Sequence, residues 1–233
     1  MPSSESTKPA DYGSFSLNQI DQTCRKAAKG VGLPWGVADD IGKALRWLSA
    51  YQLTTIPQII EVLGVYQPTH YRDTAPRNLT NPLNAKGGRL NPLLTGLVLS
   101  DMIDQMVESP IITGELAYPI FTVGFLGQVA LTPEDTVRVN WADVSLTFYR
   151  DRLAIHGNLD DLNRQFCEAL QCERVDYANL EQDQKTVKKP VMGSVNVKME
   201  DWAELEKMAH HTYVEATDES RQSGAGAGLN DND

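Results

Sequence analysis

The spacing of the apolar residues changes partway along this chain, and that change limits the possible folds more than any other feature. In residues 16–64 apolar side chains recur every three or four positions, which is the period of an amphipathic helix. In residues 137–155 they alternate with polar ones, as in a strand with one buried face. The sequence therefore predicts an α+β fold, with an N-terminal helical hairpin and further helices packed on a mainly antiparallel sheet.

The N-terminal helices carry clear start and stop signals. Ser16 and Gln19 have the spacing of a capping box, so a helix is expected to begin at residue 17. Gly42 stands inside the second predicted helix, where it costs about 1 kcal/mol relative to Ala, and we expect another element to cross closely there. Three helices are predicted in this part of the chain, over residues 17–30, 34–51 and 56–63.

Later elements follow from the same two periods. Residues 111–130 fit one or two strands or a buried helix, because periodicity does not separate these for short apolar runs. Residues 179–190 are polar and read as a linker or exposed loop. The remaining expectations are helices over 92–107, 161–170 and 200–211, and strands within 137–155 and over 194–198.

These elements suggest five segments. They are a disordered N-terminal tail at 1–15, a helical subdomain at 16–64, a loop at 65–91, an α+β body at 92–211, and a glycine-rich acidic C-terminal segment at 212–233. Within the loop, the residues from Lys86 to Arg89 could hold an anion, but they lack the spacing of a phosphate loop, and a surface turn is the favoured reading.

Charge and cysteine content narrow the possible partners and location. The formal net charge is −10, and residues 199–233 carry nine acids against two bases. Phosphate binding needs clustered Lys and Arg, so neither nucleic acid nor an anionic membrane is expected as a partner. Homo- or hetero-oligomers stay open. Cys24, Cys167 and Cys172 show no disulfide spacing, and the polar start does not resemble a signal peptide, which predicts a soluble cytoplasmic protein.

The last stretch supplies the main candidate for a ligand site. Gly224, Gly226 and Gly228 alternate with alanines, and glycine reaches backbone conformations in which neighbouring N–H groups turn toward one anion. Ser220 and Arg221 precede them and can donate hydrogen bonds to a carboxylate or phosphate. Such composition is equally typical of a disordered chain end. The alternating pattern favours an ordered anion nest.

Two further groups are candidates for site residues. Trp35, Arg46 and Trp47 would form a ligand wall with a cationic partner, although the favoured alternative is that the tryptophans anchor a helix while Arg46 lies in solvent. His156, at a predicted strand end, is the better acid–base candidate because strand termini border pockets, and Tyr213 is the second.

Three blocks carry a resemblance to a known family. They lie at residues 26–48 (KAAKGVGLPWGVADDIGKALRWL), 91–101 and 212–233. Together they resemble an uncharacterised bacterial protein family known only as a domain of unknown function. The resemblance implies a single bacterial unit over nearly the whole chain, and it brings no established activity, catalytic residue or cofactor.

Two functions from different classes stay open. One is a small-molecule enzyme or ligand-binding protein that acts on an anionic metabolite. The other is a non-catalytic subunit whose acidic C-terminal segment docks onto a basic partner protein. No cofactor and no metal are expected, although a divalent cation held by the oxygens of residues 230–233 is a lesser alternative.

Order in the C-terminal segment can be tested directly. If the glycines form a nest beside Arg221, hydrogen exchange should be slow at the amides of Ala225 and Ala227, because those N–H groups would be hydrogen-bonded or shielded. Fast exchange at both amides, with and without an added extract of cellular metabolites, would contradict the nest.

Overall fold

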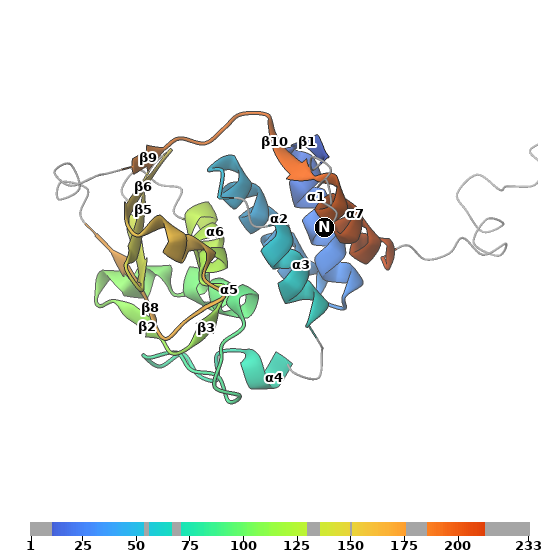
Figure 1. Ribbon diagram of the computed structural model, residues 1–233. Coiled ribbons are helices and arrows are strands. Elements are labelled where there is room, and N and C mark those ends of the chain that lie inside the picture. Colours follow the sequence, from blue (N-terminus) through green and yellow to red (C-terminus); the bar gives the residue numbers. More distant parts are fainter. Residues whose placement is uncertain are drawn as a thin grey trace, which may run out of the picture.

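The computed structural model describes residues 11–53, 56–66, 71–129, 136–149, 151–175 and 186–212. Its elements stack in three layers (Figure 1). A six-stranded sheet forms one outer layer, and helices α5 (Pro92–Asp101) and α6 (Ile120–Val129) form the middle layer. The other outer layer contains four helices, α1 (Leu17–Gly30), α2 (Trp35–Ala50), α3 (Ile56–Gly64) and α7 (Met199–His210). The predicted α+β class and N-terminal helical hairpin are confirmed.

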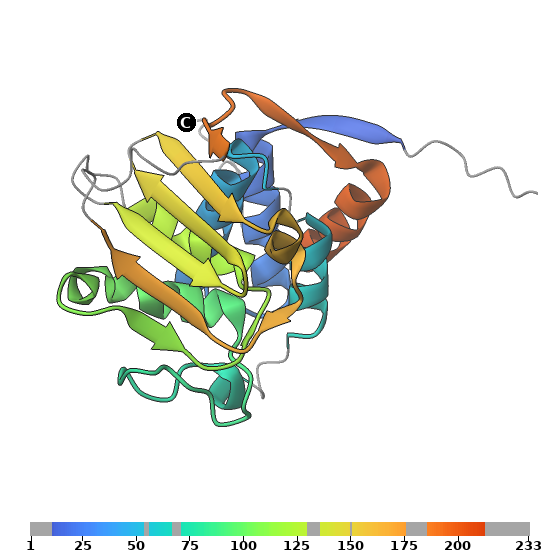
Figure 2. The ribbon, with the colours of Figure 1, turned by 60° about the vertical axis from the view of Figure 1, so that its left-hand side comes forward.

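Every pairing in the six-stranded sheet is antiparallel, and the strand order is β2-β8-β4-β5-β6-β9. Alternation places Val139, Leu146 and Ile155 opposite one another on the buried face, where the middle layer covers them (Figure 2). The strands are β2 (Ile111–Thr113), β4 (Val137–Trp141), β5 (Val144–Tyr149), β6 (Arg152–Gly157), β8 (Leu170–Arg174) and β9 (Thr186–Lys188).

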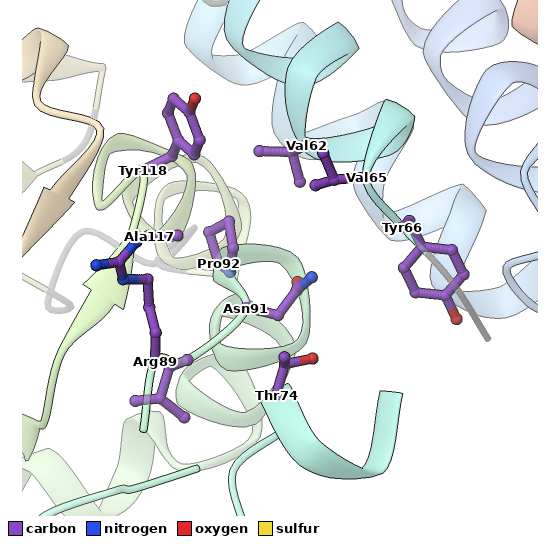
Figure 3. Close-up of a pocket in the computed structure, with 10 residues that line it drawn as sticks. Val62, Val65, Tyr66, Thr74, Arg89, Asn91, Pro92, Ala117 and Tyr118 are labelled. Atoms are coloured by element: carbon purple, nitrogen blue, oxygen red, sulfur yellow. The ribbon is translucent and has the colours of Figure 1, made fainter. Parts of the chain in front are cut away.

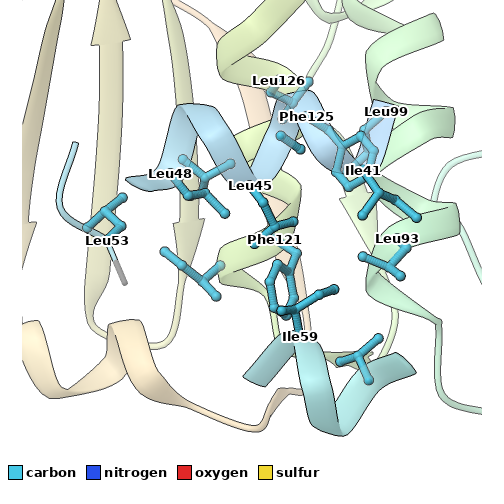
Figure 4. Packing of buried hydrophobic residues seen from close by; sticks show 14 of the residues in the cluster. Ile41, Leu45, Leu48, Leu53, Ile59, Leu93, Leu99, Phe121, Phe125 and Leu126 are labelled. Atoms are coloured by element: carbon cyan, nitrogen blue, oxygen red, sulfur yellow. The ribbon is translucent and has the colours of Figure 1, made fainter. Parts of the chain in front are cut away.

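Helix α6 is the centre of the core. Residues 120–127 are all buried, since α2 and α5 cover α6 on the sides away from the sheet (Figure 4). A helix that is apolar all round is expected in such a position. A Cβ on Gly124 would lie 2.7 Å from the carbonyl oxygen of Ala44 and 2.9 Å from Cγ of Leu48. The absence of a side chain at Gly124 therefore lets α2 approach the α6 backbone directly.

The helical layer begins as the sequence predicts. Ser16 caps α1, and the Gln19 side chain accepts from the Ser16 backbone N–H, so the capping box is complete. A Cβ on Gly42 would lie 2.7 Å from the backbone oxygen of Asp21. The expected close crossing at Gly42 is confirmed, and the crossing element is α1.

A two-stranded ribbon closes this layer. Strand β1 (Tyr12–Ser16) pairs with β10 (Ser194–Lys198), and β10 runs directly into α7. Phe15 stacks on Trp202 with ring centroids 3.9 Å apart. The predicted strand at 194–198 and the predicted final helix are confirmed, whereas β1 occupies residues that the predicted N-terminal tail had included.

One predicted helix is wrong. Residues 161–170 do not form a helix: a 3-10 turn (Leu159–Asn163) precedes two strands, β7 (Phe166–Cys167) and β8. The backbone N–H of Asp143 donates to the Asp161 carboxylate at 3.1 Å, and the Trp141 indole N–H donates to the Asp161 carbonyl at 2.8 Å. These contacts hold the turn, and β8 then fills the gap between β2 and β4. Pairing with distant strands outweighs the local helical pattern.

Four other segments are now defined. Residues 111–130 contain both kinds of structure, with β2 and β3 (Leu116–Ala117) followed by α6. The helix expected at 92–107 ends at Asp101 and continues as a 3-10 helix (Ile103–Val107). The expected linker at 179–190 contributes β9, which pairs with β6 at the sheet edge. A short helix, α4 (Tyr71–Thr74), lies within the predicted loop at 65–91.

In the ranges given above, no helix combines the length and the apolar character that crossing a bilayer requires.

The crossing at Gly42 generates a stability prediction. Gly42→Leu should lower the free energy of unfolding by about 1 to 3 kcal/mol, because the new side chain overpacks against α1. Gly36→Leu is the matched control, since Gly36 lies in the same helix and a Cβ there meets nothing within 4 Å. Urea unfolding of both variants measures the difference, and equal stabilities would contradict the tight crossing.

Candidate functional site

One side of α2 forms the wall of a cavity of about 390 Å³. Lys43, Arg46, Trp47 and Ala50 face this cavity because residues three and four apart share one side of a helix. The remaining walls come from the start of α1, the end of α6 and the chain between β9 and β10. The described lining residues are Leu17, Lys43, Arg46, Trp47, Ala50, Gln128, Pro190, Val191 and Met192. We call this cavity the α2 cleft.

The indole of Trp47 is held in place by the core. A Cβ on Gly127 would lie 2.3 Å from the Trp47 ring, so the indole rests directly on the α6 backbone. Tyr51 packs on the same ring at a centroid distance of 4.4 Å, and Phe148 meets it edge-on at 5.8 Å. Offset and edge-on arrangements of this kind are favourable for aromatic pairs. Trp47 thus gives the cleft a fixed aromatic wall.

Both charged residues among the described lining residues are cations. Lys43 Nζ lies 3.3 Å from Oδ1 of Asp40, and the side chains of Lys43 and Arg46 are each more than half exposed. Arg46 Nη1 lies 3.9 Å from Oδ2 of Asp21, which is beyond hydrogen-bond range. Asp21 therefore balances the charge of Arg46 without taking up that guanidinium N–H donor.

Asp21 lies behind the cleft and is buried, which disfavours the charged form of its carboxyl group. Burial raises the pKa of its carboxyl group, and the nearby Arg46 and Arg25 act in the opposite direction. Loss of the charge at Arg46 would therefore leave a buried carboxylate with less compensation. Arg46 has a structural role toward α1 in addition to any role toward a ligand.

The chain between β9 and β10 forms one wall of the cleft. The backbone N–H of Val191 donates to the carbonyl of Ala50 at 2.7 Å, which fixes this crossing to the end of α2. Next to it, Lys188 Nζ donates to the carbonyl of Gln52 at 3.3 Å, and burial lowers the pKa of Lys188. Met192 stands at the rim with 93% of its surface exposed.

The structure brings together two of the three residues predicted as a ligand wall. Arg46 and Trp47 both line the α2 cleft. Trp35 does not: it lies in the first turn of α2, is 52% exposed, and has Lys29 Nζ 5.5 Å from its ring centroid. The prediction that Trp35 belongs to this wall is wrong. Trp35 and Trp47 are twelve positions apart in one helix, and twelve residues of helix span about 18 Å.

The predicted acid–base residue lies elsewhere. His156 is on β6, opposite Ser145 of β5, and it is absent from the described lining of the cleft. A catalytic role for it stays a prediction. The other predicted site residues are outside the described part of the chain, namely Tyr213, Ser220, Arg221, Gly224, Gly226 and Gly228. The anion nest and the docking role of the acidic segment therefore also stay predictions.

Sequence reasoning missed Lys43 and the crossing segment. Lys43 stands four residues after Asp39, a spacing that favours an ion pair on a helix, whereas Asp39 pairs with Arg25 at 3.2 Å and Lys43 pairs with Asp40. The recurrence of Lys43 with Arg46 and Trp47 on one helix face was the available signal. The chain between β9 and β10, which crosses the end of α2, gave no signal in the sequence. Its position depends on the pairing of β9 and β10 with different sheets.

Residues 86–89 form a turn, as the favoured interpretation of the sequence predicts, and their two basic side chains pair with carboxylates. Lys86 Nζ lies 3.0 Å from Asp73 Oδ1, and Arg89 pairs with Glu115. Gly88 has a φ of 89°, which suits a tight turn.

Comparisons with known proteins support part of the predicted resemblance. Residues 15–90 match the family described as protein of unknown function DUF3726, which confirms the resemblance to a domain of unknown function over those residues. None of the curated proteins matches the chain. A crystal structure of malate dehydrogenase from Entamoeba histolytica is similar at 14% identity with a TM-score of 0.39, over 71% of this chain and 50% of that one. The chain thus spans half the length of that protein, and a likeness at this level establishes no relationship in fold or function.

The contact between the Trp47 indole and Gly127 of α6 predicts that substitutions at these two positions have coupled effects on stability. Gly127→Ala should lower the free energy of unfolding by about 1 to 2 kcal/mol, because overpacking against the indole exceeds the gain of about 1 kcal/mol in helix propensity. In a Trp47→Ala background the same change should be neutral or stabilising, since the clash is gone. Urea unfolding of the four proteins of this cycle measures the coupling. Additive effects would show that the two residues do not meet.

Proposed function

We propose that this protein binds a small anionic metabolite in the α2 cleft, either as a ligand-binding protein or as an enzyme. The observation that carries the proposal is that Lys43 and Arg46 are the charged residues among the described lining of the cleft. A cavity whose wall carries two cations favours a carboxylate or phosphate over a neutral molecule of the same shape.

The rest of the wall suggests what the anionic group is attached to. Trp47, Pro190 and Val191 offer carbon surface within the same cavity, and the volume of about 390 Å³ is within the range of small-molecule sites, about 300 to 1,000 Å³. The Gln128 side chain donates to the backbone oxygen of Asp40 at 3.2 Å, which ties the end of α6 to α2 beside the cleft. A compound with an anionic group and a flat apolar part fits this combination.

The binding role is the better supported half of the proposal. Acid–base chemistry needs a titratable group within hydrogen-bond reach of the reacting atoms. In the described part of the lining the titratable side chains are Lys43 and Arg46, and an arginine does not deprotonate in proteins. An enzymatic role would draw its proton carrier from Lys43 or from residues beyond that lining, among which Tyr213 is the predicted candidate.

The proposal is tested with matched charged and neutral probes. Isothermal titration calorimetry should show that phenyl phosphate or benzoate binds more tightly than phenol, because only the first two present an anion to Lys43 and Arg46. Lys43→Gln should weaken binding of the charged probes by about tenfold or more, as expected for the loss of about 1.5 kcal/mol from a charged hydrogen bond. Its effect on phenol should be small.

Arg46→Lys is the second variant. It keeps a positive charge beside Asp21 and removes the planar fork that grips an anion at two points, so the fold is preserved while affinity falls. Arg72→Gln is the matched control, because Arg72 is an exposed arginine on α4 and lies outside the described lining of the cleft. Equal affinity for charged and neutral probes, or no effect of either cleft variant, would contradict the proposal.

A further inference from the structure

A second cavity lies at the other end of the helical layer, between α3 and the start of α5. Its volume is about 200 Å³, and it shares no described lining residue with the α2 cleft. Figure 3 shows Val62 of α3 and Val65, which directly follows that helix, on one side, Ala117 and Tyr118 on the other, and Pro92 between them. We call this cavity the α3 pocket.

The walls of the α3 pocket are mainly carbon. Val62, Leu90 and Pro92 are buried, whereas Val65 is 77% exposed at the rim. Tyr118 adds a ring. An apolar side chain as exposed as Val65 is common by itself, but here it stands beside a hollow of similar character. The cavity is suited to an apolar molecule.

Charges near the α3 pocket are compensated by protein groups. The guanidinium of Arg89 pairs with Glu115 and lies 4.8 Å from the ring centroid of Phe166. Arg89 is therefore held between a carboxylate and a ring, and its aliphatic stem remains to face the cavity. The contrast with the α2 cleft is direct, because among the described residues the carboxylate paired with Arg46 is that of Asp21, at 3.9 Å.

Tyr118 is held in an unfavourable backbone conformation at the pocket wall. Its φ is 40°, in the left-handed region that non-glycine residues rarely adopt. Two backbone hydrogen bonds fix the strand end around it, from Tyr118 N to Gln165 O at 2.7 Å and from Ala117 N to Leu90 O at 3.1 Å. Strained residues of this kind cluster at ligand clamps. The strain here places an aromatic ring over the cavity.

The hydroxyl of Tyr118 is also engaged. It donates to the carboxylate of Glu61 on α3, and burial together with this bond raises the pKa of Tyr118 to about 12. The bond to Glu61 bridges the two sides of the pocket and occupies the phenol hydroxyl. The ring of Tyr118 therefore presents carbon rather than a free donor or a charge.

From this arrangement we propose that the α3 pocket is a second binding site, specific for a neutral, mainly apolar molecule of one or two rings. The size supports this, because an apolar cavity of about 150 Å³ is enough to bind benzene. The charge balance supports neutrality, because Arg89, the charged residue of the described lining, is already paired with Glu115, and a charged ligand would lose its hydration without a protein charge to replace it. This site is independent of the proposed anion site.

Indole is the probe, and indole-3-carboxylate is its charged counterpart. Amide chemical shifts in NMR titrations should move saturably for Val62, Ala117 and Tyr118 with indole. Indole-3-carboxylate should perturb these amides with at least about tenfold weaker affinity. Phenyl phosphate at saturation should leave the indole affinity unchanged, since it addresses the other cavity. Absence of indole binding, or equal affinity for both probes at these amides, would overturn the proposal.

Two variants locate the site. Ala117→Leu fills the cavity and should weaken indole binding by at least about tenfold. Val65→Lys places a charge at the rim on a side chain that is already in solvent, so the fold is kept even if Ala117→Leu is poorly folded; it too should weaken indole binding. Val107→Lys is the matched control, because Val107 is 64% exposed in the 3-10 helix and outside the described lining of the pocket. Indole affinity that survives Val65→Lys and a folded Ala117→Leu would place binding elsewhere and overturn the proposal.

Discussion

The burial of helix α6 on all sides is the constraint on which the rest of the structure depends. The sheet covers one side of α6, and α2 and α5 cover the others. Gly124 lets the α2 backbone approach, and Gly127 gives the Trp47 indole a place on the α6 backbone. Because the glycines set the distance between α2 and α6, they also set the position of the cleft that α2 borders. The packing of α2 on α6 in the core therefore also positions the residues of α2 that line the cleft.

The two cavities differ in how their cations are balanced. In the α2 cleft, Arg46 faces the cavity with a loosely placed carboxylate behind it, whereas Arg89 near the α3 pocket is bound by Glu115 and Phe166. The free energy of taking a charged ligand out of water is offset only where a protein charge is available to replace the solvent. We therefore expect the α2 cleft to select anionic ligands and the α3 pocket to select neutral, apolar ones.

Arg46 is a candidate binding residue that also has a structural role, because it compensates the charge of the buried Asp21. Its positive charge favours the ionised form of Asp21, whose pKa is raised by burial against α2. An anion in the cleft would compete with Asp21 for Arg46, and Asp21 would then lose part of its compensation. If the proposed anion binds there, the interface between α1 and α2 is coupled to the charge in the cleft through the Arg46–Asp21 pair.

The sequence by itself determined the elements whose signals are local. The capping box at Ser16, the helical spacing along α1 and α2, and the alternation in β4, β5 and β6 each depend on residues a few positions apart, and all of them are present. It also singled out Arg46 and Trp47. Tertiary structure decided the rest: strand β8 forms because β2 and β4 lie on either side of it, and Lys43 joins Arg46 at a cavity because β9 and β10 pair with separate sheets and carry the chain across α2. Such pairings join residues far apart in the chain, and local spacing carries no record of them.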